Sequence, residues 1–103
     1  MRIEGDGRSA PRAAALERAE TLAIEALGHI AGDETTLERF LSLSGLSPET
    51  LRAAAAEPGF LAGVLDFLAG DESLLLAFAA NAGRDPAEIT RARETLAPRG
   101  EAV

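Results

Sequence analysis

Residues Phe40–Arg52 read FLSLSGLSPETLR, and this stretch indicates two helices joined by a tight turn. Gly45 follows an apolar helical segment. Ser47 and Pro48 then open a new helix, because serine caps a helix N-terminus and proline suits its first turn. Such a turn is typical of a helix-turn-helix. The segment 34–56 is therefore a candidate nucleic-acid-binding motif.

The same helix-boundary signals recur along the chain and predict six short helices with no strand. We expect Gly32 to adopt the left-handed conformation that ends a helix. We also expect Glu88 to complete a capping box with Asp85. The expected helix starts or N-caps are Pro11 (after Ser9 or Ala10), Asp33, Ser47, Phe60, Asp71 and Asp85, and the expected stops are Gly32, Gly45, Pro58, Gly70, Gly83 and Pro98.

Apolar residues repeat at helical spacing within each predicted helix. Trp, Tyr and Cys are absent and there are four Phe, so we expect a core built from Leu and Ala. The predicted inward-facing residues are Leu16, Ala19, Ala23, Leu27, Ile30, Leu37, Phe40, Leu41, Phe60, Leu61, Val64, Leu65, Leu68, Leu74, Leu75, Phe78, Ala79, Ile89, Ala92 and Leu96.

The chain resembles itself at an offset of 38 residues. Residues 31–54 and 69–92 share nine identities in 24 ungapped positions, among them Gly45 with Gly83 and Pro48 with Pro86. Either internal duplication or convergence on common helix-boundary signals explains this similarity. We predict a single all-α domain over residues 11–97, composed of two related three-helix units, about 22–56 and 60–94. A flexible arm (1–10) and a loose tail (98–103) flank it.

Composition excludes several classes of protein. With 103 residues the chain can bury one core. The absence of cysteine excludes a disulfide scaffold and favours a reducing cytoplasm. Neither a secretory signal nor an apolar run long enough to cross a membrane is present. The formal net charge is −7, and residues 33–83 hold eight acidic residues against two arginines, a balance of −6.

This charge argues against DNA binding by segment 34–56. Affinity for DNA comes from neutralised phosphates, and discrimination comes from long polar side chains at base edges. The expected groove-facing positions hold one arginine and one glutamate: Glu49, Thr50, Arg52, Ala53 and Ala56. The second unit offers Ala87, Glu88, Arg91 and Glu94. We therefore interpret the turn as a packing device, and we do not expect a nucleic-acid partner.

No residue pattern indicates catalysis, a cofactor or a metal. The acidic pairs Asp33-Glu34 and Asp71-Glu72 suit helix N-termini, which favour negative charge. A calcium loop needs more oxygens at fixed spacing. His29, the sole histidine, aligns with Phe67 and reads as a packing position. An enzyme would need perturbed carboxylates around Asp66 or Asp71, which the spacing does not suggest.

An excess of apolar residues indicates an interaction surface. Three consecutive leucines, residues 74–76, span about 200° of a helix, so at least one points away from the core. Leu43, Leu46 and Phe67 add to this excess. An exposed apolar patch with acids around it is typical of a protein interface. A fifth helix that is covered on all sides would explain the leucines equally well.

The runs GLSPETLR, EPGFLAGVLDFL and DESLLLAFA carry a resemblance to a known family. Between about Leu16 and Ala97 the chain resembles the bacterial domain-of-unknown-function family 3572, found mainly in alphaproteobacteria. The resemblance implies a stand-alone helical cytoplasmic protein and assigns no activity, cofactor or catalytic residue.

We therefore predict a non-enzymatic protein-interaction module that acts as a homodimer or as an acidic adaptor. Its binding residues are not identified by the sequence. No small-molecule substrate and no membrane partner are indicated. The alternative is a nucleic-acid-associated regulator that uses segment 34–56.

Overall fold

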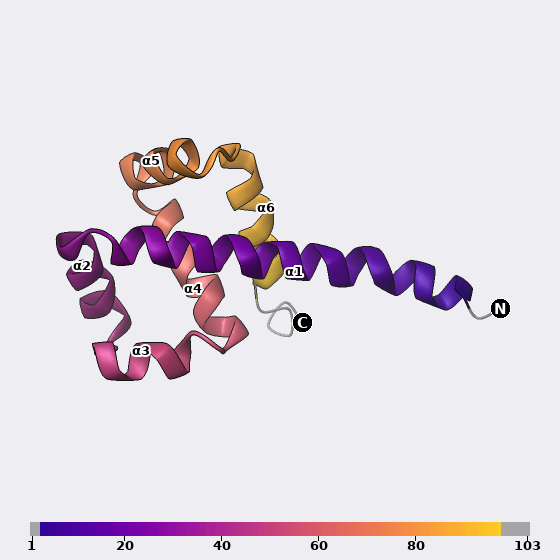
Figure 1. Ribbon diagram of the computed structural model, residues 1–103, viewed down its shortest axis with the longest axis horizontal. Coiled ribbons are helices and arrows are strands. Elements are labelled where there is room, and N and C mark those ends of the chain that lie inside the picture. Colours follow the sequence, from indigo (N-terminus) through magenta and orange to yellow (C-terminus); the bar gives the residue numbers. More distant parts are fainter. Residues whose placement is uncertain (1–2, 98–103) are drawn as a thin grey trace.

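The computed structural model describes residues 3–97, with side chains from Arg12 onward except that of Pro58. No strand occurs in this range, so the predicted all-α class is confirmed. The N-terminal part of α1 projects beyond the other helices (Figure 1), and the longest dimension is 53 Å. The helices are α1 (Ile3–Ala31), α2 (Glu34–Ser44), α3 (Pro48–Ala54), α4 (Pro58–Ala69), α5 (Glu72–Ala82) and α6 (Pro86–Leu96).

The core lies where α1, α4 and α6 pack against one another. α2 packs on α1 and α5 packs on α4, whereas α3 makes the least contact and has no fully buried residue. Small alanines on α1 let the other helices approach closely, while Phe40 and Phe78 insert from α2 and α5. The buried residues are Ala19, Leu22, Ala23, Ala26, Ile30, Phe40, Leu61, Ala62, Val64, Leu65, Leu68, Phe78, Ala79, Ile89, Ala92 and Leu96.

The predicted caps are present. Asp33 and Asp71 accept hydrogen bonds from the third backbone N–H of α2 and α5. Gly45 and Gly83 end these helices in the left-handed conformation, with φ of 75° and 69°. Asp85 caps α6 by accepting from the N–H of Ala87 at 2.9 Å. These local interactions give α2 and α5 matching boundaries, and they give α3 and α6 matching starts.

Four local predictions about helix boundaries are wrong. α4 begins at Pro58 instead of Phe60, because proline suits the first turn of a helix. α1 starts at Ile3 instead of Pro11, so Pro11 lies within the helix, where it removes one backbone N–H donor. Gly32 does not have a positive φ, and its N–H still donates to the carbonyl of Gly28 at 3.0 Å. Glu88 forms no capping box with Asp85, because its carboxylate pairs with Arg84 instead.

The two predicted units correspond closely in α2 and α5, which have equal length. They differ in their third helices, since α6 packs against both α1 and α4 while its counterpart α3 lies at the periphery. The duplication itself stays a prediction. The expected arm is helical from Ile3, and the expected tail lies outside the described residues.

Within residues 3–97, no helix combines the length and the apolar character that crossing a membrane requires.

Candidate interaction surface

The helix-turn-helix-like segment has the backbone geometry expected of it. The N–H of Gly45 donates to the carbonyl of Leu41 at 2.9 Å and ends α2. Ser47 accepts from the N–H of Thr50, and the Thr50 hydroxyl accepts from the N–H of Ser47 at 3.0 Å. This reciprocal capping box starts α3. Local hydrogen bonds therefore fix where α2 ends and where α3 begins.

All five expected groove-facing positions of this segment are exposed. Arg52 is their one cation. Glu49 lies on the same short helix, and hydrogen bonds from its own backbone N–H and from Ser47 lower the pKa of its carboxyl. This surface therefore pairs one positive with one negative charge, although phosphate binding generally draws on several arginines or lysines.

A shallow depression of about 590 Å³ opens where α2, α4 and α5 meet. Its large apolar side chains are Leu43 from α2 and Phe67 from α4. Leu43 is 74% exposed, while Phe67 is half-buried and packs against the core. We call this surface the Leu43–Phe67 depression. It is lined by Arg39, Leu43, Asp66, Phe67, Gly70, Asp71, Glu72 and Ser73.

Arg39 organises one side of the depression. Its Nη2 donates to Oδ2 of Asp71 at 2.9 Å, and its guanidinium lies 5.4 Å from the centroid of the Phe67 ring. Asp71 also accepts from the N–H of Leu74 at 3.2 Å. The N–H of Leu74 and, to a smaller extent, Arg39 lower the pKa of the Asp71 carboxyl. Asp71 is therefore a carboxylate at neutral pH and holds the start of α5 in place.

Two of the three carboxylates that line the depression, Asp66 and Asp71, are engaged in structural contacts. Asp66 accepts a hydrogen bond from Nε of Arg93, which links α4 to α6. A general acid at neutral pH needs a raised pKa, and that of Asp71 is shifted in the opposite direction. Among the side chains that the structure describes, no three histidine, aspartate or glutamate residues converge as metal ligands.

The structure also separates the three consecutive leucines. Leu74 and Leu75 pack against the core, whereas Leu76 is 48% exposed. Leu76 follows Ser73 by three residues and therefore lies one turn along the same face of α5. Leu46 is half-buried in the turn before α3.

His29 is a packing residue in the structure. Its half-buried ring meets the edge of Phe78, with centroids 5.5 Å apart. Asp33, the other polar candidate nearby in sequence, accepts from both the N–H and the hydroxyl of Thr36. The hydroxyl of Thr36, followed by its N–H, lowers the pKa of the Asp33 carboxyl. Both residues have structural contacts that account for their positions.

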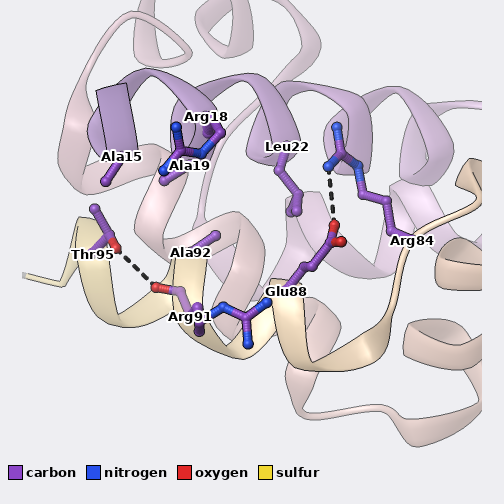
Figure 2. A pocket seen from close by; sticks show the side chains of 9 residues that line it. All are labelled: Ala15, Arg18, Ala19, Leu22, Arg84, Glu88, Arg91, Ala92 and Thr95. Atoms are coloured by element: carbon purple, nitrogen blue, oxygen red, sulfur yellow. Dashed lines mark hydrogen bonds and ion pairs between the residues drawn. The ribbon is translucent and has the colours of Figure 1, made fainter. Parts of the chain in front are cut away.

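A second surface was missed by sequence reasoning. It is a groove of about 410 Å³ between α1 and α6, shown in Figure 2. Charged and small residues recur on one face of each helix, but the spacing within a helix does not indicate which two faces will meet. We call it the α1–α6 groove. It is lined by Ala15, Arg18, Ala19, Leu22, Arg84, Glu88, Arg91, Ala92 and Thr95.

Arg84 joins the two sides of this groove. Its Nε and Nη2 donate to the two carboxylate oxygens of Glu25 on α1, at 2.9 and 3.1 Å. Its Nη1 donates to Glu88 on α6 at 3.2 Å. The hydrogen bonds from Arg84 lower the pKa of Glu25, and Glu25 in turn raises the pKa of Arg84. The three residues connect the start of α6 to the C-terminal third of α1.

A family model described as "Protein of unknown function (DUF3572)" matches residues 16–99. No curated protein and no solved structure matches the chain. The matched range begins within α1 and includes all residues of the Leu43–Phe67 depression. It also includes every residue of the α1–α6 groove except Ala15.

Proposed function

The chain belongs to the family of proteins of unknown function numbered 3572, and on that premise we propose that it is a non-enzymatic protein-interaction module. The observation that carries the proposal is the exposure of Leu43. This side chain is 74% exposed and lines the same depression as Phe67. A partner that covers both residues would remove a contiguous apolar surface from water.

The energetic gain from such contact is substantial. Burying a leucine or phenylalanine side chain completely contributes about 1.5–3 kcal/mol, and Leu43 begins from a largely exposed position. Interfaces concentrate their affinity in a few such central residues, surrounded by polar groups that exclude water. Asp66, Glu72 and Ser73 supply polar groups around Leu43 and Phe67.

The charge around the depression favours an acidic adaptor over a homodimer. Two copies meeting through this surface would bring their carboxylates together, and like charges across an interface oppose association. A partner with apolar residues flanked by arginine or lysine would be attracted instead. Adaptor binding should therefore weaken as salt increases, whereas a homodimer limited by repulsion should strengthen.

The test compares Leu43→Ser with Ile24→Ser. Ile24 is a matched control, because it is 55% exposed and does not line the depression. Tagged proteins would be used for capture from native lysate, and mass in solution would be measured by light scattering. We expect Leu43→Ser to lose a captured protein, or a dimeric mass, that Ile24→Ser retains. A monomer whose captured proteins are the same for both variants would contradict the proposal.

The geometry of the helix-turn-helix-like turn supports one alternative. Segment 34–56 presents all five expected groove-facing positions to solvent, so a nucleic-acid-associated regulator is sterically possible. This alternative predicts retention on DNA at low salt with a steep salt dependence. If a titration with DNA at about 50 mM salt gives a flat curve, and therefore no binding, this alternative is wrong. We place either function in the cytoplasm, because a chain without cysteine forms no disulfide and so does not depend on an oxidising compartment.

A further inference from the structure

The α1–α6 groove has a local charge that differs from the rest of the molecule. Its lining holds three arginines and one glutamate, while the whole chain has a formal net charge of −7. Arg84 is held by Glu25 and Glu88. Arg18 and Arg91 make no ion pair with any described side chain, and both are exposed. Two guanidinium groups are therefore available to a ligand.

The two arginines lie on opposite sides of the groove. Figure 2 shows Arg18 on α1 and Arg91 on α6, with small side chains between the two helices. Ala19 and Ala92 are buried in the floor of the groove, where α1 and α6 pack together, whereas Ala15 is half-buried and partly open to a ligand. Leu22 is buried beside them and belongs to the same packing.

The length of the groove suits an elongated segment. Its lining on α6 extends from Arg84 just before the helix to Thr95 near its end. At 1.5 Å per residue the helical part of this stretch, from Pro86 to Thr95, spans about 14 Å, or roughly two and a half helical turns. A helix that docks into a groove between two helices uses residues three and four apart for contact.

We propose that the α1–α6 groove binds an acidic amphipathic helix of another protein. Carboxylates on that helix would bind Arg18 and Arg91, whose planar guanidinium groups can each donate two parallel hydrogen bonds to a carboxylate. The contact of Arg84 with both oxygens of Glu25 shows this chemistry within the chain. Small apolar residues of the helix would lie over the three alanines.

Nucleic acid fits the same groove less well. Nucleic-acid affinity grows with the number of phosphates neutralised, and two unpaired arginines on a chain of charge −7 supply few. A short acidic helix needs no more than two such contacts. It also brings fewer negative charges than nucleic acid does near the acidic surface of this chain. The observations therefore favour a protein ligand.

The test uses the full chain and a defined probe. The probe is a fluorescein-labelled, alanine-based helical peptide of about 15 residues, with glutamates four positions apart. A matched peptide carries glutamine in their place. Fluorescence anisotropy measures binding at low salt, and amide chemical shifts locate the bound peptide. Two double variants are compared. One combines Arg18→Glu with Arg91→Glu, and the milder one combines Arg18→Gln with Arg91→Gln. The single variant Arg52→Glu is the control.

We expect the glutamate peptide to shift amides of residues 15–22 and 84–95, and to bind at least about ten-fold more tightly than the glutamine peptide. Both double variants should weaken binding by about ten-fold or more, whereas Arg52→Glu and Leu43→Ser should leave it within about two-fold. Circular dichroism would verify that each variant is folded.

Several results would overturn the proposal. These are equal binding of the two peptides, equal weakening by Arg52→Glu and by the groove variants, shifts confined to other helices, or no binding at millimolar peptide. Tighter binding of a DNA duplex than of the peptide, lost in the double variants, would assign the groove to nucleic acid instead. Because Leu43 does not line the groove, failure here leaves the Leu43–Phe67 proposal standing.

Discussion

The rings of His29 and Phe78 meet edge to face, with centroids 5.5 Å apart and planes at 64°. The rings of Phe67 and Phe40 meet in the same way, at 5.2 Å and 72°. At the offset of 38 residues, His29 corresponds to Phe67 and Phe40 corresponds to Phe78. The two ring contacts are therefore the same contact made in both directions between the two predicted units. The units thus contact each other reciprocally, as two subunits do across an isologous interface.

We expect His29→Phe to leave thermal stability unchanged or higher. Phe67 occupies the corresponding position, and the half-buried His29 ring has open space on its exposed side. The substitution keeps the edge-to-face contact with Phe78, and such contacts contribute about 0.5–1.5 kcal/mol. Thermal unfolding followed by circular dichroism measures the effect. A marked loss of stability would mean that the imidazole has a role beyond packing.

Phe78→Ala should be among the most damaging single changes. Phe78 is 2% exposed, and removing a fully buried phenylalanine ring costs about 3–5 kcal/mol. Leu43→Ala should change the free energy of unfolding by no more than about 0.5 kcal/mol, because surface substitutions have small effects. Urea unfolding of both variants tests this contrast. A large cost for Leu43→Ala would show that this side chain supports the fold rather than a partner.

The contribution of the Glu25–Arg84 pair should depend on pH. Hydrogen bonds from Arg84 lower the pKa of Glu25 below its ordinary value of 4.5, so the folded state favours the ionised carboxylate. The stabilisation is complete above that value and is lost as pH falls through the lowered pKa. The difference in unfolding free energy between wild type and Glu25→Gln should therefore close below pH 4.5. Glu17→Gln, on the same helix and without an ion pair to a described residue, is the matched control.

Ser47→Ala should loosen α3 without unfolding the core. The capping box with Thr50 is lost, and loss of a serine cap costs about 1 kcal/mol. Because α3 has no fully buried residue, the loss should appear as local opening. Hydrogen exchange should accelerate at the amides of 50–55 while the midpoint of global unfolding changes little. A cooperative loss of the whole fold would contradict the peripheral role of α3.

Gly45→Ala and Gly32→Ala should have opposite effects. Gly45 has a φ of 75°, a conformation that costs a residue with a side chain about 1–2 kcal/mol. Gly32 lacks a positive φ, and a Cβ there would meet ordinary contacts at 3.5 Å. Alanine at position 32 should therefore be neutral or stabilise by about 0.4–1 kcal/mol. Calorimetry of the two variants measures the difference. Equal destabilisation would show that both glycines are needed for their backbone conformations.

Much of the fold could be predicted from the sequence because helix boundaries depend on nearby residues. The caps at Asp33, Ser47, Asp71 and Asp85 and the left-handed Gly45 and Gly83 are settled within one turn of the chain. The predicted inward-facing residues of α6 are all buried. Predictions failed where a local signal permits two outcomes. Pro11 can begin a helix or lie within one, and Glu88 can bond to a backbone N–H or to Arg84.

The candidate surfaces required the packed molecule. Composition and spacing predicted excess apolar residues near the acids, but the exposure of Leu43 beside Phe67 depends on how α2, α4 and α5 meet. Leu16 is 41% exposed although its spacing suggested a core position, because the buried face of α1 begins at Ala19. The sequence by itself determined the helical class and the turns, whose hydrogen bonds join residues within five positions of one another. The tertiary structure decided which side chains became surfaces, because Arg84 and Glu25 are 59 residues apart and no local pattern relates them.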